Sequence, residues 1–228
     1  QVRIVPRRDG RVLVDDLIKH VDDSTRIISV SWVGYASGYR IDIGSLVQQA
    51  HDRGILVFLD AIQGLGVFPL DLKETPVDFL AADGHKWLLG PEGRGVAMIR
   101  KEHIGRLRCG NVGWSSVKNA MEYGSPSFDL REDAARFESG SANMVGTQAL
   151  AASLDIFLQV IQQHGPEAIG RRVVELAERL DELLRSAGAR TRLPSSVANR
   201  SGILTFDVPG IEPAEVRRRA LEEKVVVS

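Results

Sequence analysis

The chain has few of the features that mark secreted, disulfide-bonded or membrane-spanning proteins. Its 228 residues include one cysteine, so no internal disulfide can form and nothing favours an oxidising compartment. No apolar run approaches the roughly 18 residues needed to span a bilayer. Residues 1–10 lack the apolar core of a signal peptide. We therefore expect a cytoplasmic protein that does not bind a membrane.

An excess of charge of either sign is also missing. The sequence has 29 basic and 30 acidic residues, which give a formal net charge of −1. Because a nucleic-acid partner requires a basic surface, this balance gives no support for one. The hydrophobic residues, 43% of the chain, are enough to form a sizeable core in one large domain or in one and a half.

Short apolar runs, separated by a helical pattern and by glycine-rich loops, predict an α/β sheet. The runs expected as strands are residues 26–32, 55–59, 79–82 and 95–99. Between the first two, Asp42 is suited to cap a helix and Gly54 to end it. A strand, a helix and a second strand in this order predict a right-handed βαβ unit with parallel strands.

The second half of the chain is mainly helical in pattern. Asn143 is suited to cap a long helix that ends at Gly165, and Pro166 to open a second one. After these helices we expect a strand, a helix and a final strand, at residues 203–208, 212–223 and 225–228. This β-α-β tail predicts a smaller α+β C-terminal domain, with residues 1–164 in a large domain and 165–228 in the small one.

Two ionisable residues follow predicted strands, Asp60 after the second and Lys86 just after the third. Open α/β sheets bind ligands beyond the carboxyl ends of their strands, so these two side chains are candidates for a ligand site. The simpler interpretation is a structural ion pair, and the residues around them decide between the two.

Residues 60–63 (Asp-Ala-Ile-Gln) and 82–87 (Ala-Asp-Gly-His-Lys-Trp) together resemble the paired signature of class V aminotransferases. The resemblance continues, in the family's order, through residues 31–43, 90–95, 112–114 and 136–143. It implies the fold-type-I architecture of pyridoxal-phosphate enzymes, with a mainly parallel sheet in an aspartate-aminotransferase-like large domain. The family includes cysteine desulfurases, selenocysteine lyases, kynureninases and isopenicillin N epimerase.

The resemblance implies a role for four side chains around pyridoxal 5′-phosphate. Lys86 would hold the cofactor as a Schiff base and later move the substrate's α-proton as a general base. Asp60 would keep the ring nitrogen protonated, which lets the ring withdraw electrons. Gln63 would hydrogen-bond the phenolic oxygen, and His85 would donate to the phosphate. A loop histidine satisfied by backbone groups is the simpler interpretation of His85.

Two positions depart from the family pattern. Members often have a small hydroxyl residue where this chain has Asp83, and an ionised carboxylate would repel a phosphate. We therefore assign Asp83 to the turn and not to the phosphate. Tyr35 stands where desulfurases commonly have asparagine, and its hydroxyl can make a similar hydrogen bond to the phenolic oxygen. Simple packing is the alternative for Tyr35.

Ser141 precedes the long predicted helix, whose N-terminus suits a phosphate. In the family this hydroxyl reaches the cofactor of the neighbouring subunit, which implies a homodimer with its sites at the interface. The alternative is that Ser141 merely caps the helix. Cys109 follows the fourth predicted strand and is interpreted as a buried or idle thiol, and we expect no metal site.

The resemblance implies a small amino-acid substrate, with cysteine desulfuration or a related lyase step as the best match. Transamination, epimerisation and kynureninase-type hydrolysis stay open, because the family's phosphate loop lies before residue 1 and its carboxylate-binding arginine after residue 228. A hypothesis of another class is a non-catalytic scaffold that retains the fold. Because family parts are missing at both ends, this chain is expected to be a fragment, inactive by itself.

Overall fold

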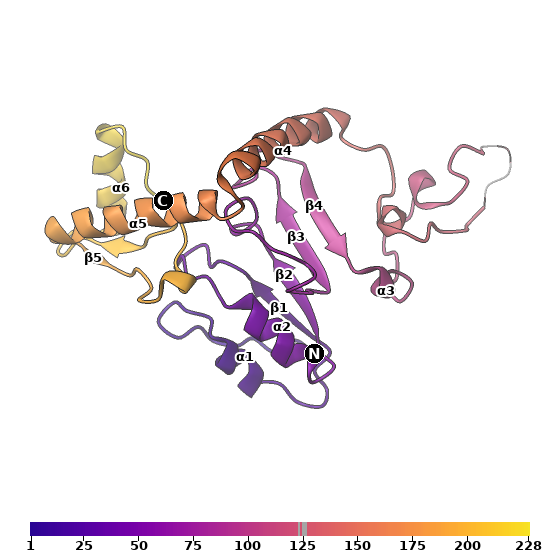
Figure 1. The fold of residues 1–228 in the computed structure, drawn as a ribbon, viewed down its shortest axis with the longest axis horizontal. Helices are drawn as coiled ribbons and strands as arrows, with labels where there is room; N and C mark the ends of the chain where they lie inside the picture. Colours follow the sequence, from indigo (N-terminus) through magenta and orange to yellow (C-terminus); the bar gives the residue numbers. More distant parts are fainter. Residues whose placement is uncertain (123, 125–126) are drawn as a thin grey trace.

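The computed structural model describes residues 1–122, 124 and 127–228, and a four-stranded sheet lies at its centre (Figure 1). The strands are β1 (Ile27–Ser31), β2 (Leu56–Asp60), β3 (Phe79–Asp83) and β4 (Gly95–Ile99). They lie in this order across the sheet, with β1, β2 and β3 parallel and β4 antiparallel to β3. The predicted mixed α/β fold with a mainly parallel sheet is confirmed.

Helix α2 (Ile43–His51) connects β1 to β2, as the apolar spacing predicts. The side chain of Asp42 caps it by accepting a hydrogen bond of 3.0 Å from the backbone N–H of Ser45. Its apolar residues are buried in the core, and Gly54, at φ 68°, turns the chain into β2. A short helix, α1 (Val14–Lys19), packs beside α2.

The two faces of the sheet are buried to different extents. Val57 and Leu59 of β2 are fully buried, whereas Phe58 and Asp60, which point to the opposite face, are half-buried. The same alternation holds in β1, where Ile28 is buried and the residues on either side are exposed. One face therefore packs in the core, and the other is open enough to receive a ligand.

Helix α4 (Met144–His164) crosses above β3 and β4 in Figure 1 and begins where predicted. Asn143 caps it by accepting from the N–H of Gly146 at 2.9 Å. In contrast to our expectation that no run is long enough, α4 is long and apolar enough to cross a membrane by length and composition. That criterion alone is weak support for a membrane span. Most of α4 is exposed, and the large apolar side chains among its exposed residues are Met144, Val145, Ile156, Leu158 and Ile161.

The C-terminal part contains α5 (Ala168–Ser186), the antiparallel pair β5 (Arg190–Thr191) and β6 (Phe206–Asp207), and α6 (Pro213–Glu222). Three expectations are corrected here. Helix α5 begins two residues after Pro166, the strand expected at 203–208 is reduced to β6, and residues 225–228 form no strand. The last four residues have no neighbouring strand to pair with among the described residues, and apolar composition alone does not make a strand.

A short helix and three turns of 3-10 helix complete the described elements: α3 (Lys101–Ile104), η1 (Trp114–Ser116), η2 (Ala134–Phe137) and η3 (Val197–Asn199). Residues 105–122, 124 and 127–142 extend away from the sheet on the side opposite to α5 and α6 (Figure 1). Trp114 lies in this extension and is half exposed, so it is not a core residue in this structure.

The segment after α5 packs against the loop that follows β1. Ser201, almost fully buried, donates from its hydroxyl to the carbonyl of Gly38 at 2.7 Å, and Thr205 donates to the carbonyl of Ala36 at 2.7 Å. Val174 of α5 lies in the same hydrophobic core as the sheet. A division into domains near residue 165 stays a prediction, and the two parts share one core.

Candidate active site

The carboxyl edge of the parallel strands gathers polar side chains on the open face of the sheet. Ser31 lies in register with Asp60, and Asp60 with Ala81. Asp83 follows Ala81 by two residues and therefore points to the same face. Strand alternation and register alone thus bring Ser31, Asp60 and Asp83 to one edge.

Asp60 is held by two hydrogen bonds at this edge. One carboxylate oxygen accepts from the hydroxyl of Ser31 at 2.8 Å, and the other accepts from the backbone N–H of Ile62 at 3.1 Å. A carboxylate has about four acceptor positions, so these two bonds fix its orientation and leave acceptor capacity for a ligand. Asp60 is also half-buried, which allows a ligand to reach it.

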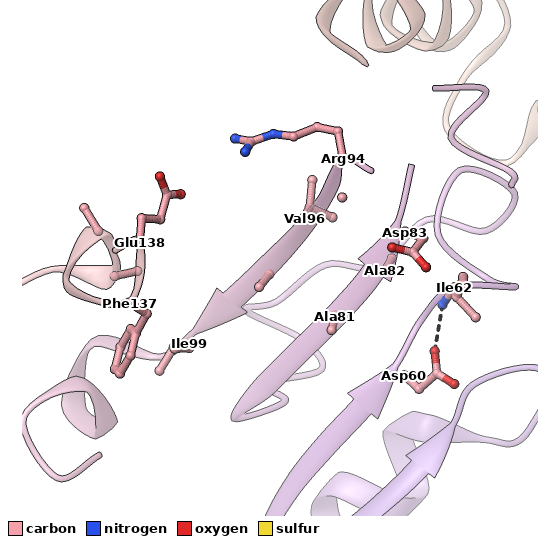
Figure 2. A pocket seen from close by; sticks show the side chains of 14 residues that line it. Asp60, Ile62, Ala81, Ala82, Asp83, Arg94, Val96, Ile99, Phe137 and Glu138 are labelled. Atoms are coloured by element: carbon pink, nitrogen blue, oxygen red, sulfur yellow. Dashed lines mark hydrogen bonds between the residues drawn. The ribbon is translucent and has the colours of Figure 1, made fainter. Parts of the chain in front are cut away.

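A cavity of about 550 Å³ opens beside these residues. Its walls are formed by the ends of β2 and β3, by β4, and by η2 with Glu138. Figure 2 shows the carboxylates of Asp60 and Asp83 on neighbouring strands, and the side chain of Arg94, which is the residue before β4. The cavity is therefore lined by three carboxylates and one guanidinium, on a floor of small residues such as Ala81 and Ala97.

Lys86 lies in the tight turn that leaves β3. The turn is closed by the N–H of Gly90, which donates to the carbonyl of Gly84 at 2.8 Å, and by the N–H of Leu89, which donates to the carbonyl of Lys86 at 3.0 Å. Lys86 is half-buried, and its amine has no ion pair or hydrogen bond within the described residues. The structural ion pair with Asp60, our simpler alternative, does not form.

His85 and Asp83 face each other across the same turn. His85 Nδ1 lies 4.0 Å from a carboxylate oxygen of Asp83, and His85 is exposed. This contact agrees with an orienting role for Asp83 in the turn. The exposed His85 ring is accessible to a ligand.

Gln63 lies in the turn after β2 and contacts the residue that follows Lys86. Its amide oxygen accepts from the indole N–H of Trp87 at 3.0 Å. Neither Gln63 nor Lys86 nor His85 lines the cavity, whereas Asp60 does. Bridging of Asp60 and Lys86 by one cofactor ring therefore stays a prediction.

The other two predicted site residues lie on more exposed parts of the chain. Tyr35 is 77% exposed, so our alternative that it serves for packing is wrong in this structure. Ser141 is exposed and lies two residues before Asn143, which is the residue that caps α4. The alternative interpretation of Ser141 as a helix cap is therefore also wrong, and its predicted role toward a neighbouring subunit stays open.

Sequence reasoning missed two residues of this edge. Ser31 was recognisable, because the residue that ends one parallel strand lies beside the residue that ends the next. The hydrogen bond of Trp87 to Gln63 had no signal in the sequence, since it joins two turns 24 residues apart. Trp87 also packs against the core, in addition to its contact with Gln63.

The residues present fit the predicted cofactor. The unpaired Lys86 amine is what an aldehyde requires, and the spare acceptor positions of Asp60, at the wall of the cavity, are what a protonated ring nitrogen requires. The fold and this edge thus define an α/β protein with a candidate ligand site at the carboxyl ends of parallel strands.

Comparison with known families agrees with this description. The family model described as aminotransferase class-V matches residues 1–228, and the chain therefore belongs to the class V aminotransferase family. The chain is 30% identical over 222 residues to a probable cysteine desulfurase of Methanothermobacter thermautotrophicus. This alignment covers 95% of this chain and 52% of that protein. The chain is 33% identical over 156 residues to a kynureninase of Bacillus thuringiensis, over 67% of this chain and 36% of that enzyme.

Solved structures are similar in the same way. The apo structure of a cysteine desulfurase from Thermococcus onnurineus superposes with a TM-score of 0.84 at 27% identity, over 94% of this chain and 52% of that one. A cystine C-S lyase in complex with cysteine persulfide shares the fold, with a TM-score of 0.83 at 23% identity, over 94% of this chain and 56% of that one. The chain spans about half the length of the curated desulfurases that it matches.

Proposed function

We propose that this chain is the cofactor-binding part of a pyridoxal-phosphate enzyme that acts on a small amino acid. The observation that carries the proposal is the half-buried, unpaired amine of Lys86 on the turn after β3, next to the strand that ends in Asp60. An amine that must condense with an aldehyde has to be free of a salt bridge, and Lys86 meets that requirement.

Bound pyridoxal phosphate supplies an electron sink for bond cleavage at the α-carbon of an amino acid. Asp60, oriented by Ser31, would hold a proton on the ring nitrogen. Lys86 would hold the cofactor covalently and then move the substrate's α-proton. Gln63 would donate to the phenolic oxygen, and His85 to the phosphate.

The preferred reaction is a cysteine desulfurase or selenocysteine lyase step, as the similarity to probable cysteine desulfurases favours. The similarity to kynureninases supports hydrolysis of a kynurenine-like substrate as the second candidate. Full-length protein incubated either with L-cysteine and a thiol reductant or with L-kynurenine separates the two. Desulfuration yields alanine and a persulfide that the thiol reduces to sulfide, whereas hydrolysis of kynurenine yields anthranilate. Transamination and epimerisation within the family remain further alternatives.

A non-catalytic scaffold is the alternative of another class. Retention of Asp60, Gln63, His85 and Lys86 as a set argues against it. We also propose a homodimer in which Ser141 reaches the partner's cofactor, because α4, which follows Ser141, exposes apolar side chains that a second copy would cover. A cytoplasmic location is proposed from the single, unpaired cysteine.

The test is the substitution Lys86→Ala in the full-length protein, compared with wild type after loading with pyridoxal phosphate. Wild type is expected to retain a visible absorption band after dialysis, and Lys86→Ala is expected to lose it, because no covalent bond to the cofactor remains. Lys101→Ala, on α3 and away from the turn, serves as the matched control and should retain the band. A band that persists in Lys86→Ala would show that another lysine holds the cofactor.

A further inference from the structure

The indole N–H of Trp87 determines which way the Gln63 amide faces. The N–H lies 3.0 Å from the Gln63 Oε1. An indole can only donate, so the amide must present its oxygen to Trp87 and its NH₂ group elsewhere. In the described part of the chain this NH₂ group has no hydrogen-bond partner, so both of its N–H groups are available to a ligand oxygen.

The Trp87 ring is held from the C-terminal side of the molecule. A Cβ atom placed on Gly202 would lie 2.9 Å from Cη2 of the indole and 2.6 Å from Cγ1 of Val173. The ring therefore lies against the backbone of residue 202, a contact that only glycine permits. The neighbouring Ser201 is fixed in turn by its buried hydrogen bond to Gly38.

The backbone of Trp87 is held from the opposite side by the turn that carries Gln63. Gly66 has φ 95°, and a Cβ atom there would lie 2.4 Å from the Trp87 carbonyl oxygen. The turn after β2 and the turn after β3 thus pack directly on each other. Trp87 is the residue at which the two turns and the C-terminal segment meet.

We propose that Trp87 is a positioning residue that orients the Gln63 amide toward the phenolic oxygen of the cofactor, and that Gly202 holds the indole in place for this task. The inference rests on the proposed function. Through this contact the C-terminal segment, in which Gly202 lies 115 residues after Trp87, influences the electronic state of the cofactor. Trp87 itself touches neither substrate nor cofactor in this proposal.

The experiment follows the pH midpoint of the visible cofactor band in the full-length, loaded protein. Trp87→Phe keeps a ring against Gly202 and removes the N–H. A donor to an ionised oxygen favours its unprotonated form, so freeing the Gln63 amide should raise the midpoint by about half a pH unit to one unit. The cofactor dissociation constant should rise roughly fivefold.

A second variant shows whether Trp87 acts through Gln63. Gln63→Leu alone should raise the midpoint at least as far as Trp87→Phe, and Trp87→Phe added to Gln63→Leu should then produce no further shift. Trp114→Phe, at a half-exposed position in the extension, is the matched control and should leave the midpoint unchanged. Gly202→Ala displaces the indole and should move the midpoint in the same direction as Trp87→Phe.

The outcomes separate this inference from the proposed function. Wild type with no Lys86-dependent band refutes the proposed function and the inference with it. A normal wild-type band with an unchanged midpoint in Trp87→Phe refutes the inference alone. A shift of equal size in the Gln63→Leu background also refutes it, since Trp87 would then act by another route.

Discussion

Two aspartates at opposite edges of the sheet show how the same residue type serves two purposes. Asp60 ends β2 at the carboxyl edge and accepts two hydrogen bonds, from Ser31 and from the backbone of Ile62. Asp78 precedes β3 at the amino edge and accepts three, from His51, His103 and the backbone N–H of Val57. Asp60 is half-buried, whereas Asp78 is only 3% exposed.

The difference lies in how much of each carboxylate the protein itself uses. At Asp78 the chain supplies donors from α2, β2 and α3 at 2.7–2.9 Å, and so pins three elements together. At Asp60 the chain supplies enough donors to fix the orientation and no more. A carboxylate that is saturated and buried is structural, and one that is oriented yet accessible is available to a ligand.

The largest effect is expected at the carboxyl edge. Asp60→Asn removes the negative charge and keeps the shape, so the ring nitrogen of the cofactor would lose the group that keeps it protonated. We expect kcat/KM of the full-length enzyme to fall roughly a hundredfold or more, with a change of less than about 1 kcal/mol in the free energy of unfolding. Steady-state kinetics and urea unfolding measure the two. If Asp60→Asn stays fully active, Asp60 has only a structural role, like Asp78.

At the amino edge, substitution of Asp78 should lower the stability of the fold and leave the chemistry of the site unchanged. Burial alone raises the pKa of Asp78, but the hydrogen bonds from His51, the Val57 N–H and His103 outweigh it and hold this pKa below its usual value. A carboxyl whose folded pKa is lowered stabilises the fold above its unfolded pKa, near 4, and this contribution is lost as the pH falls through the folded pKa. Asp78→Asn should therefore cost about 2 kcal/mol of unfolding free energy at pH 7.

In acid, the difference in unfolding free energy between Asp78→Asn and wild type is expected to disappear. Urea unfolding at pH 7, 5, 4 and 3 should show wild type and Asp78→Asn converging below about pH 4. Asp207→Asn, in an exposed pair with Arg192, is the matched control and should match wild type within about 0.5 kcal/mol at each pH. A deficit that is constant from pH 7 to pH 3 would contradict the assigned role of the charge.

Much of the carboxyl edge was predictable from the sequence, because it depends on local patterns. Alternation within apolar runs and the Asp42 and Gly54 signals fixed the strands and α2. Two parallel strands that end in Ser31 and Asp60 bring those residues together without further information. The order of motifs then identified the family over the whole chain.

The parts of the fold that could not be predicted depend on contacts between segments distant in sequence. The Asp78 cluster joins residues 25 and 27 positions apart that have no shared motif, and it was not predicted. Residues 225–228 have strand composition but no partner strand among the described residues. The exposure of the large apolar residues of α4 also had no signal in the sequence, since periodicity shows which side chains share a face but not what covers that face.

The smallest effect is expected at Ser31, which tests how far the orientation of Asp60 depends on its neighbouring strand. Ser31→Ala removes one of the two donors that orient Asp60 and leaves the backbone N–H of Ile62 in place. A hydrogen bond of this kind contributes about 1 kcal/mol, so kcat/KM should fall roughly fivefold with little change in stability. Ser29→Ala is the matched control, because Ser29 lies on the same strand and face, is exposed, and makes no hydrogen bond from its side chain within the described residues. Equal changes in kcat/KM in the two variants would show that Asp60 is oriented by its own turn alone, and not by the hydroxyl on the neighbouring strand.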